Sequence, residues 1–165
     1  MLFVKKSQIP GAGMGLYSDT LIKKDAKVLE YIGEIITWAE AEKRDDDGEG
    51  GYVFYITKNK CIDAYAEPKN LARYANDARG LTRKEGCRNN SFYAVRNRRA
   101  YIIASRNIKV GEEIFVWYGA DYWLPWIESL KAQEQRKSDE AKAKAAHKKV
   151  KIVVMPHHHP KKSSR

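Results

Sequence analysis

The chain has 165 residues and a formal net charge of +10, from 31 Lys and Arg against 21 Asp and Glu. This length predicts one domain with a single core, and 10 Tyr, 4 Trp and 4 Phe exclude a wholly disordered chain. Only two cysteines, Cys61 and Cys87, are present, which excludes a disulfide framework and a four-cysteine zinc site. The apolar runs are too short to cross a bilayer and no signal-peptide pattern begins the chain, so we expect an intracellular protein, cytoplasmic or at the nucleoid or nucleus, with no membrane partner.

The predicted elements of the first half are short strands separated by turns. In chain order they are a strand at residues 1–6, a glycine-dense loop at 9–15, a strand at 28–32, a helix at 37–44, an acidic loop at 45–51, and strands at 52–56 and 60–63. The helix is predicted from Thr37, an N-cap residue with Glu40 three positions later. Residues 70–76 are either a short helix or an irregular segment.

The second half changes from strands to a helix. A hairpin is predicted at 91–95 and 99–105 about the Asn97-Arg98 turn, followed by a single strand at 114–117. From Trp123 the apolar spacing becomes helical, which predicts a C-terminal helix over 124–147 and a basic, largely disordered tail over 148–165. Residues 131–165 hold 11 Lys and Arg but 3 Asp and Glu. This segment either contacts nucleic acid or another anionic surface without sequence preference, or is a solubilising appendage.

Short blocks of residues recur in an order that is more specific than any of them alone. They are Gly13-Met-Gly-Leu16, Glu30-Tyr-Ile-Gly-Glu34, Cys61-Ile-Asp-Ala64, Asn70-Leu-Ala-Arg-Tyr-Ala-Asn-Asp77, Cys87-Arg-Asn-Asn90 and Gly111-Glu-Glu-Ile-Phe-Val-Trp-Tyr-Gly119. Over residues 2–123 this succession resembles the SET-domain protein lysine methyltransferases. The resemblance implies a small, stand-alone SET protein, mainly β with short helices, whose small curved sheets surround a pseudoknot. The implied organisation is a SET domain at 1–123, a C-terminal helix at 124–147 and a tail at 148–165.

The resemblance also implies a methyl donor, S-adenosylmethionine, and residues that bind it. Gly13, Met14 and Gly15 match the family's first glycine motif, whose main chain holds the methionine part of the cofactor. Residues 73–77 match the family's Arg-Phe-x-Asn-His block, which assigns cofactor contacts to Arg73, Tyr74, Asn76 and Asp77. Asp77 replaces the usual histidine, so contacts through the imidazole are lost and those through the backbone remain.

Two tyrosines match the family's catalytic positions. Tyr118 matches the tyrosine of the Gly-Glu-Glu block, and Tyr31 matches the Tyr-x-Gly motif that lines the lysine channel. Methyl transfer needs a neutral lysine amine, whereas an ordinary lysine has a pKa of about 10.4. A narrow aromatic channel supplies desolvation and ring faces for the substrate lysine, so no metal is required. Many relatives close the site with a cysteine-rich zinc segment, which this chain lacks. In its place Trp123 either is a lid, which binds the cofactor by covering its adenine or covers the channel, or simply docks the C-terminal helix.

The leading hypothesis is therefore an S-adenosylmethionine-dependent protein lysine N-methyltransferase. Its expected substrate is a basic protein that presents a lysine, whether histone-like, DNA-associated or ribosomal. The alternative is a catalytically silent SET-fold module that binds basic peptides or nucleic acid. The retained Tyr31, Asn76 and Tyr118 favour the enzyme. The sequence leaves the oligomeric state and the degree of methylation open.

Overall fold

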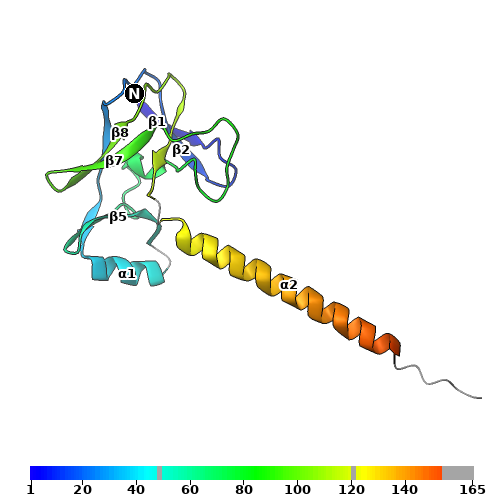
Figure 1. The fold of residues 1–165 in the computed structure, drawn as a ribbon. Helices are drawn as coiled ribbons and strands as arrows, with labels where there is room; N and C mark the ends of the chain where they lie inside the picture. Colours follow the sequence, from blue (N-terminus) through cyan, green and yellow to red (C-terminus); the bar gives the residue numbers. More distant parts are fainter. Residues whose placement is uncertain (48–49, 120–121, 154–165) are drawn as a thin grey trace, which may run out of the picture. The chain divides into compact units, whose positions relative to one another are not determined.

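Three small β-sheets make up the first of the two units into which the chain divides, Met1–Tyr122; the second unit begins at Trp123. The computed structural model describes residues 1–47, 50–119 and 122–153. Figure 1 shows the sheets and the helices α1 and α2.

The sheets are short, and neighbours in a sheet are often distant in the chain. The first has the order β1-β2-β9, formed by Leu2–Lys6, Met14–Ser18 and Glu113–Ile114. The second has the order β10-β7-β8-β3, formed by Val116–Trp117, Ser91–Arg96, Arg99–Ala104 and Lys27–Tyr31. The third has the order β4-β6-β5, formed by Glu34–Ile36, Lys60–Asp63 and Val53–Thr57. Only β10 and β7 pair in parallel among the strand pairs of the described residues.

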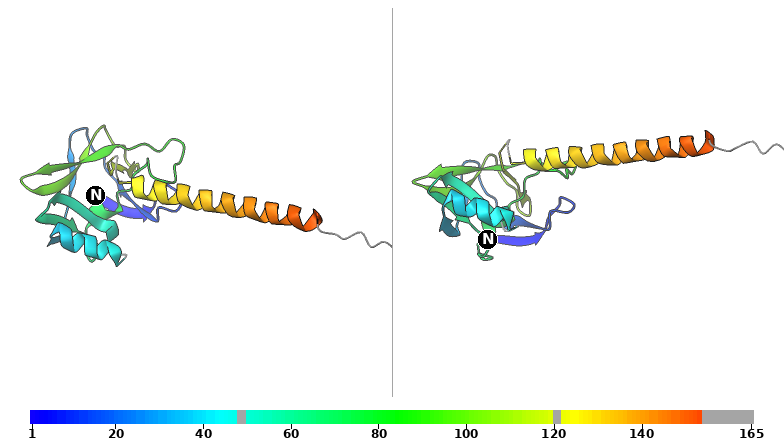
Figure 2. Two further views of the ribbon diagram at one scale, coloured as in Figure 1. Left: turned by 60° about the horizontal axis from the view of Figure 1, so that its bottom comes forward. Right: turned by 90° about the horizontal axis from the view of Figure 1, so that it is seen from below.

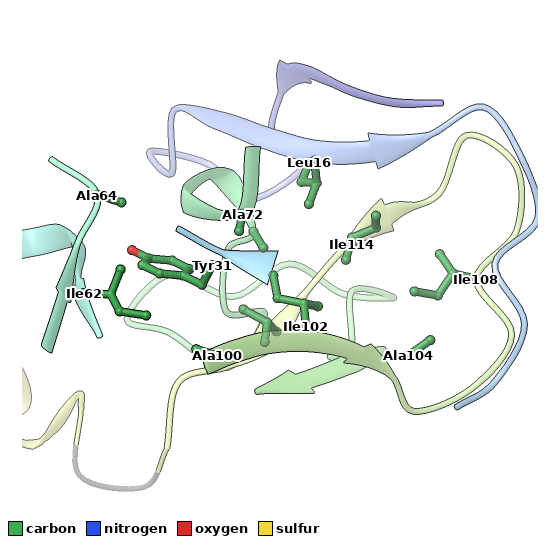
Figure 3. Close-up of a cluster of buried hydrophobic side chains, with 12 residues drawn as sticks. Leu16, Tyr31, Ile62, Ala64, Ala72, Ala100, Ile102, Ala104, Ile108 and Ile114 are labelled. Carbon is green, nitrogen blue, oxygen red and sulfur yellow. The ribbon is translucent and has the colours of Figure 1, made fainter. Parts of the chain in front are cut away.

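The core lies where the first two sheets face each other. Leu16, Ile102, Ile114 and Val116 are fully buried there, because alternate residues of each strand point to the same side. In Figure 3, Tyr31 lies at the end of this cluster near Ile62 of the third sheet and Ala64, the residue that follows β6. The core thus reaches the third sheet through an aromatic side chain that also carries a hydroxyl.

The third sheet is covered on one side by helix α1, Trp38–Asp46. Thr37 caps this helix by accepting a hydrogen bond from the amide of Glu40, as the capping pattern predicts. Ala41 packs on the buried Ile36 and Cys61 of the sheet. Two short 3₁₀ turns complete the unit, η1 at Gly50–Tyr52 and η2 at Leu71–Tyr74. The element expected at residues 70–76 is therefore helical over four residues.

The prediction of a single strand at 114–117 is wrong. These residues form two strands, β9 and β10, which belong to different sheets. The break falls at Phe115, whose carbonyl accepts hydrogen bonds from the amides of Asn90 and Ser91. Its own amide donates to the side chain of Asn90. These bonds use the main-chain groups that a continuous strand would need, so the chain changes sheets there.

The C-terminal helix α2 spans Leu124–Val153 and is six residues longer than expected at its C-terminal end. Figure 2 shows it as one continuous helix. Lysine, valine and isoleucine continue the helical segment over residues 148–153, and no glycine or proline interrupts it there. The remainder of the expected tail, residues 154–165, lies outside the described residues. Among the described residues, no helix combines the length and apolarity needed to cross a membrane.

Candidate active site

The glycine loop between β1 and β2 lies against the segment that carries Asn76. The side-chain amide of Asn76 donates a hydrogen bond to the carbonyl of Met14 at 2.9 Å. The loop closes on itself through a bond from the Ser7 amide to the Gly13 carbonyl. Gly13 has a φ of +69°, a conformation that favours glycine, and the space where its Cβ would stand is open within 4 Å. The backbone of the loop is therefore accessible at Gly13.

The buried carboxylate of Glu113 binds this loop through hydrogen bonds. It is fully buried and accepts hydrogen bonds from four donors. These are the Ser7 hydroxyl at 2.6 Å, the Gln8 amide at 2.7 Å, the Tyr17 hydroxyl at 2.8 Å and the Asn76 amide at 3.4 Å. A Cβ at Gly15 would lie 2.2 Å from an oxygen of this carboxylate, so the position requires glycine. Burial and the carboxylate raise the pKa of Tyr17, which keeps its hydroxyl protonated as a donor.

Sequence reasoning missed Glu113. Its signal was present in the Gly-Glu-Glu block, but the four groups that it binds come from positions as distant as Ser7. A carboxylate that satisfies several donors at once rigidifies what it touches. Glu113 thus fixes the position of the glycine loop relative to Asn76.

Asp77 ties three parts of the chain together. One carboxylate oxygen accepts from the amide of Arg79 at 2.8 Å and from the side chain of Asn89 at 2.7 Å. The other accepts from the main-chain amide of Tyr118 at 3.2 Å. These contacts position the backbone at both Asn76 and Tyr118. They are contacts to protein groups, so a direct contact of this carboxylate with the cofactor remains a prediction.

Segments from three regions are hydrogen-bonded to one another beside Asp77. Asn90 binds main-chain groups of Glu113 and Phe115, with its amide donating to the Glu113 carbonyl at 2.7 Å. The amide of Val116 donates to the carbonyl of Asn76 at 2.9 Å. Residues 76–77, 90–91 and 113–118 are therefore hydrogen-bonded to one another at one place. The family resemblance implies that Asn90 helps to tie the pseudoknot, and this role stays a prediction.

Tyr118 and Tyr31 belong to one cluster of aromatic rings. The distances between ring centroids are 5.7 Å for Tyr31–Phe54, 6.0 Å for Tyr31–Tyr93, 4.8 Å for Phe54–Tyr93, 6.5 Å for Tyr93–Tyr118 and 4.7 Å for Tyr118–Tyr122. The Tyr118 hydroxyl donates to the carbonyl of Ala75 at 2.9 Å. The Tyr31 hydroxyl donates to the carbonyl of Tyr52 at 2.8 Å. These bonds fix both hydroxyls relative to the rings.

Burial keeps these phenols neutral. It is the largest cause of the raised pKa of Tyr31, Tyr93, Tyr118 and Tyr122. Phe54 and Tyr93 were not singled out from the sequence, because aromatic residues in β5 and β7 have the ordinary pattern of core residues. The cluster offers ring faces and protonated hydroxyls and carries no tyrosinate charge near neutral pH.

Arg73 and Tyr74 lie on η2, one turn before Asn76. Asn70 begins this turn by accepting from the Ala72 amide, and its side-chain amide donates to the Ile32 carbonyl. The Arg73 guanidinium lies 4.0 Å from the centroid of the Tyr52 ring and donates to the Tyr65 carbonyl. Its buried Nε has no hydrogen-bond partner in the described part of the chain. Tyr74 packs against the main core, so its expected cofactor contact stays a prediction.

The remaining predicted residue, Trp123, is the first residue of the second unit. Its role as a lid or as a docking residue for α2 stays a prediction. Within residues 1–47, 50–119 and 122–153, no group of three or more His, Cys, Asp or Glu side chains is arranged to hold a metal ion. The residues that the structure does bring together are Gly13, Met14, Gly15 and Asn76 in one cluster, and Tyr31 and Tyr118 in another.

Comparison with known families identifies the fold. The model of the SET domain matches residues 13–119. The chain belongs to the SET-domain protein lysine methyltransferase family. This match spans the glycine loop, the Asn76 segment and the aromatic cluster up to Tyr118, so both clusters lie within the SET domain.

Relatives of known name support this assignment. N-lysine methyltransferase KMT5A of Xenopus tropicalis is 30% identical over 125 residues, which are 70% of this chain and 36% of that protein. Histone-lysine N-methyltransferase Set8 of Drosophila melanogaster is 29% identical over 118 residues, 66% of this chain and 16% of that protein. A chain in a crystal structure of an active polycomb repressive complex 2 in the basal state superposes with a TM-score of 0.62 and 29% identity, covering 73% of this chain and 15% of that one. The chain thus spans about a third or less of the length of these proteins.

Proposed function

We propose that this chain is an S-adenosylmethionine-dependent protein lysine N-methyltransferase that acts on a basic protein. The observation that carries the proposal is the adjacency of two clusters. The segment from Ala75 to Asp77 contributes Asn76 to the glycine loop, while the carbonyl of Ala75 accepts from the Tyr118 hydroxyl. The adjacent residues Ala75 and Asn76 therefore contact the aromatic cluster and the cofactor-binding motif, respectively.

The residues present fit S-adenosylmethionine, the methyl donor that SET-domain methyltransferases use. The open space at Gly13 leaves the loop backbone accessible to a bound group. The unpaired Nε of Arg73 is a buried donor that needs an acceptor, and the carboxylate of the cofactor supplies that chemistry. When bound, S-adenosylmethionine supplies a methyl group on a positively charged sulfur. We assign its binding to Gly13, Met14, Gly15, Arg73 and Asn76.

The aromatic cluster acts on the substrate lysine. Tyr31, Phe54 and Tyr93 remove water from the lysine stem and offer ring faces to its amine. Removing water disfavours the charged ammonium, which lowers the pKa of the lysine and exposes its lone pair. The Tyr118 hydroxyl, held by the Ala75 carbonyl, orients the reacting groups. Most of the rate enhancement comes from this positioning.

A basic protein substrate is supported by two observations. Relatives such as Set8 of Drosophila melanogaster are named as histone-lysine methyltransferases. The helix α1 and the following residues carry several acidic groups, among them Glu42, Asp45 and Asp46, which are exposed and attract a positively charged segment. Histone-like, DNA-associated and ribosomal proteins share this chemistry. An intracellular location, in the cytoplasm or at the nucleoid or nucleus, belongs to the same proposal.

The test combines cofactor binding with product analysis. S-adenosylmethionine is titrated into the chain by calorimetry, and thermal unfolding is followed at saturating cofactor. Binding with an increase in Tm is expected, since a ligand specific for the folded state stabilises it. Basic proteins and an acidic control protein are then incubated with the chain and cofactor, and mass spectrometry locates methylated lysines. Cofactor binding without any methylated lysine would support the silent SET-fold module instead.

A further inference from the structure

The helix α2 has two halves of different charge. Residues 124–140 contain three basic residues, Lys131, Arg136 and Lys137, against four acidic ones. Residues 141–153 contain five lysines and no acidic residue. The positive charge of the C-terminal region thus begins at residue 141 instead of rising evenly from residue 131. We call residues 141–153 the basic half of α2.

Most of the first half of α2 is exposed to water, and its own sequence stabilises the helix there. All residues from 128 to 144 are exposed, so burial contributes little to this stretch of the helix. Alanine, glutamine, glutamate and lysine dominate it, and these are strong helix formers. Gln135 donates to Asp139 one turn later at 2.9 Å, and Lys142 lies 4.0 Å from the same carboxylate. Lys144 stands four residues after the last acidic residue, Glu140, whereas Lys148, Lys149 and Lys151 lie two or more turns beyond it.

The basic half has the dimensions of a nucleic-acid contact. Thirteen helical residues span about 20 Å, at about 1.5 Å per residue. Double-stranded DNA carries one negative charge per about 1.7 Å of its axis, and its major groove admits an α-helix. Lys144, Lys148 and Lys151 are spaced by four and three residues, the spacing that lines one helix face. We propose that the basic half of α2 binds the phosphates of double-stranded DNA without sequence preference.

The composition of the basic half favours duplex DNA over other anionic partners. Proteins that bind single strands use aromatic side chains on which bases stack, and residues 141–153 contain no Phe, Tyr or Trp. A helix that lies on a membrane needs a continuous apolar face with large side chains. The only apolar residues from 141 to 149 are alanines, with Val150, Ile152 and Val153 confined to the last turn. The basic half can therefore recognise a partner only through its positive charge, which is complementary to the negative charge of the phosphate backbone.

This binding does not depend on methyl transfer. It would hold the SET domain near proteins that are themselves bound to DNA, and so raise the local concentration of such substrates. The inference therefore goes beyond the proposed function, and either one can fail without the other. Cofactor binding and activity on a free peptide serve as the separate readout of the enzyme.

The test compares two variants of the full chain that remove the same charge. The first replaces the five lysines of the basic half with glutamine, which keeps the helix propensity: Lys142, Lys144, Lys148, Lys149 and Lys151. The matched control replaces five exposed lysines of the first unit with glutamine: Lys6, Lys23, Lys24, Lys84 and Lys109. Binding to a fluorescent 20-base-pair duplex is followed by anisotropy at several salt concentrations. Circular dichroism checks that both variants keep the helix content of the unaltered chain.

The expected result has a defined salt dependence. With three phosphate contacts, from Lys144, Lys148 and Lys151, the slope of log affinity against log salt is about −2.7, so affinity falls about 40-fold between 50 and 200 mM salt. The variant of the basic half loses most of this slope and at least about tenfold in affinity at the lowest salt. The control variant keeps both close to the values of the unaltered chain.

Three results would overturn the proposal. Equal losses in the two variants would assign binding to net charge and not to α2. Unchanged DNA binding in the variant of the basic half would exclude this segment. Tighter binding to single-stranded RNA, or to vesicles that contain phosphatidylserine, than to the duplex at equal salt would identify a different partner.

Discussion

Replacing Tyr118 with phenylalanine separates catalysis from folding at the centre of the aromatic cluster. The change keeps the ring that packs against Tyr93 and Tyr122. It removes the hydroxyl that donates to the buried carbonyl of Ala75 at 2.9 Å. Losing one such bond costs about 1 kcal/mol, which lowers the Tm of a domain of this size by about 4 °C.

The expected effect on turnover is larger. Removing a positioned polar group from a water-excluded site lowers kcat by about 10²-fold or more, or about 2.7 kcal/mol. A domain with about 5–15 kcal/mol of stability stays almost fully folded after losing 1 kcal/mol. Unfolding therefore cannot account for a 10²-fold loss, and the two effects are distinguishable.

The assay measures methyl transfer to a lysine peptide at saturating cofactor, together with thermal unfolding and the Kd for S-adenosylmethionine. Tyr101→Phe is the matched control, because Tyr101 lies on β8 and contacts Lys27 and Arg99 instead of the cluster. We expect unchanged cofactor affinity in both variants and loss of turnover only in Tyr118→Phe. Turnover close to that of the unaltered chain in Tyr118→Phe would refute the reasoning.

Four further predictions follow from the same contacts. Asn76→Ala removes the bond to the glycine loop and raises the Kd for S-adenosylmethionine at least about tenfold, while the separately measured Kd of the peptide stays the same. Glu113→Gln removes the charge that four donors share and costs about 2 kcal/mol of stability; in steady-state kinetics the KM for the cofactor rises and kcat changes little, whereas an unchanged KM would make Glu113 purely structural. Deleting residues 131–165 leaves the rate on a short lysine peptide nearly unchanged, and loss of that activity would show that the segment helps to build the site. Burial raises the pKa of Tyr31 and Tyr118 above the ordinary value of 10.0, so the unfolded chain loses these protons at lower pH than the folded chain. The free energy of unfolding is therefore expected to fall as the pH rises above about 10. Urea unfolding between about pH 9 and about pH 11 measures this change.

Local sequence patterns predicted the elements whose bonds are local. Thr37 caps α1 through Glu40, three residues away. The hairpin of β7 and β8 turns at Asn97 and Arg98, both with positive φ, as the asparagine there suggests. The end of α2 was misplaced because the helical composition continues past residue 147 without a stop signal.

The site needed tertiary information that one sequence does not carry. The strand around Phe115 breaks because Asn90, 25 residues earlier, binds its main chain. The role of Glu113 depends on partners such as Ser7, which donates a hydrogen bond to it from 106 positions away. Tyr93 and Phe54 become site residues only because Tyr31 packs against both. The resemblance of short motifs predicted the residues that bind and react, and the structure adds the side chains that hold these candidates in place.

A crystal structure of the chain with S-adenosylhomocysteine and a lysine peptide tests the central claim most directly. The account predicts the cofactor product beside Gly13 and Asn76. It predicts the lysine side chain against the rings of the Tyr31, Phe54 and Tyr93 cluster, with its nitrogen near the Tyr118 hydroxyl. A lysine bound outside this cluster, or a cofactor product bound away from the glycine loop, would contradict it.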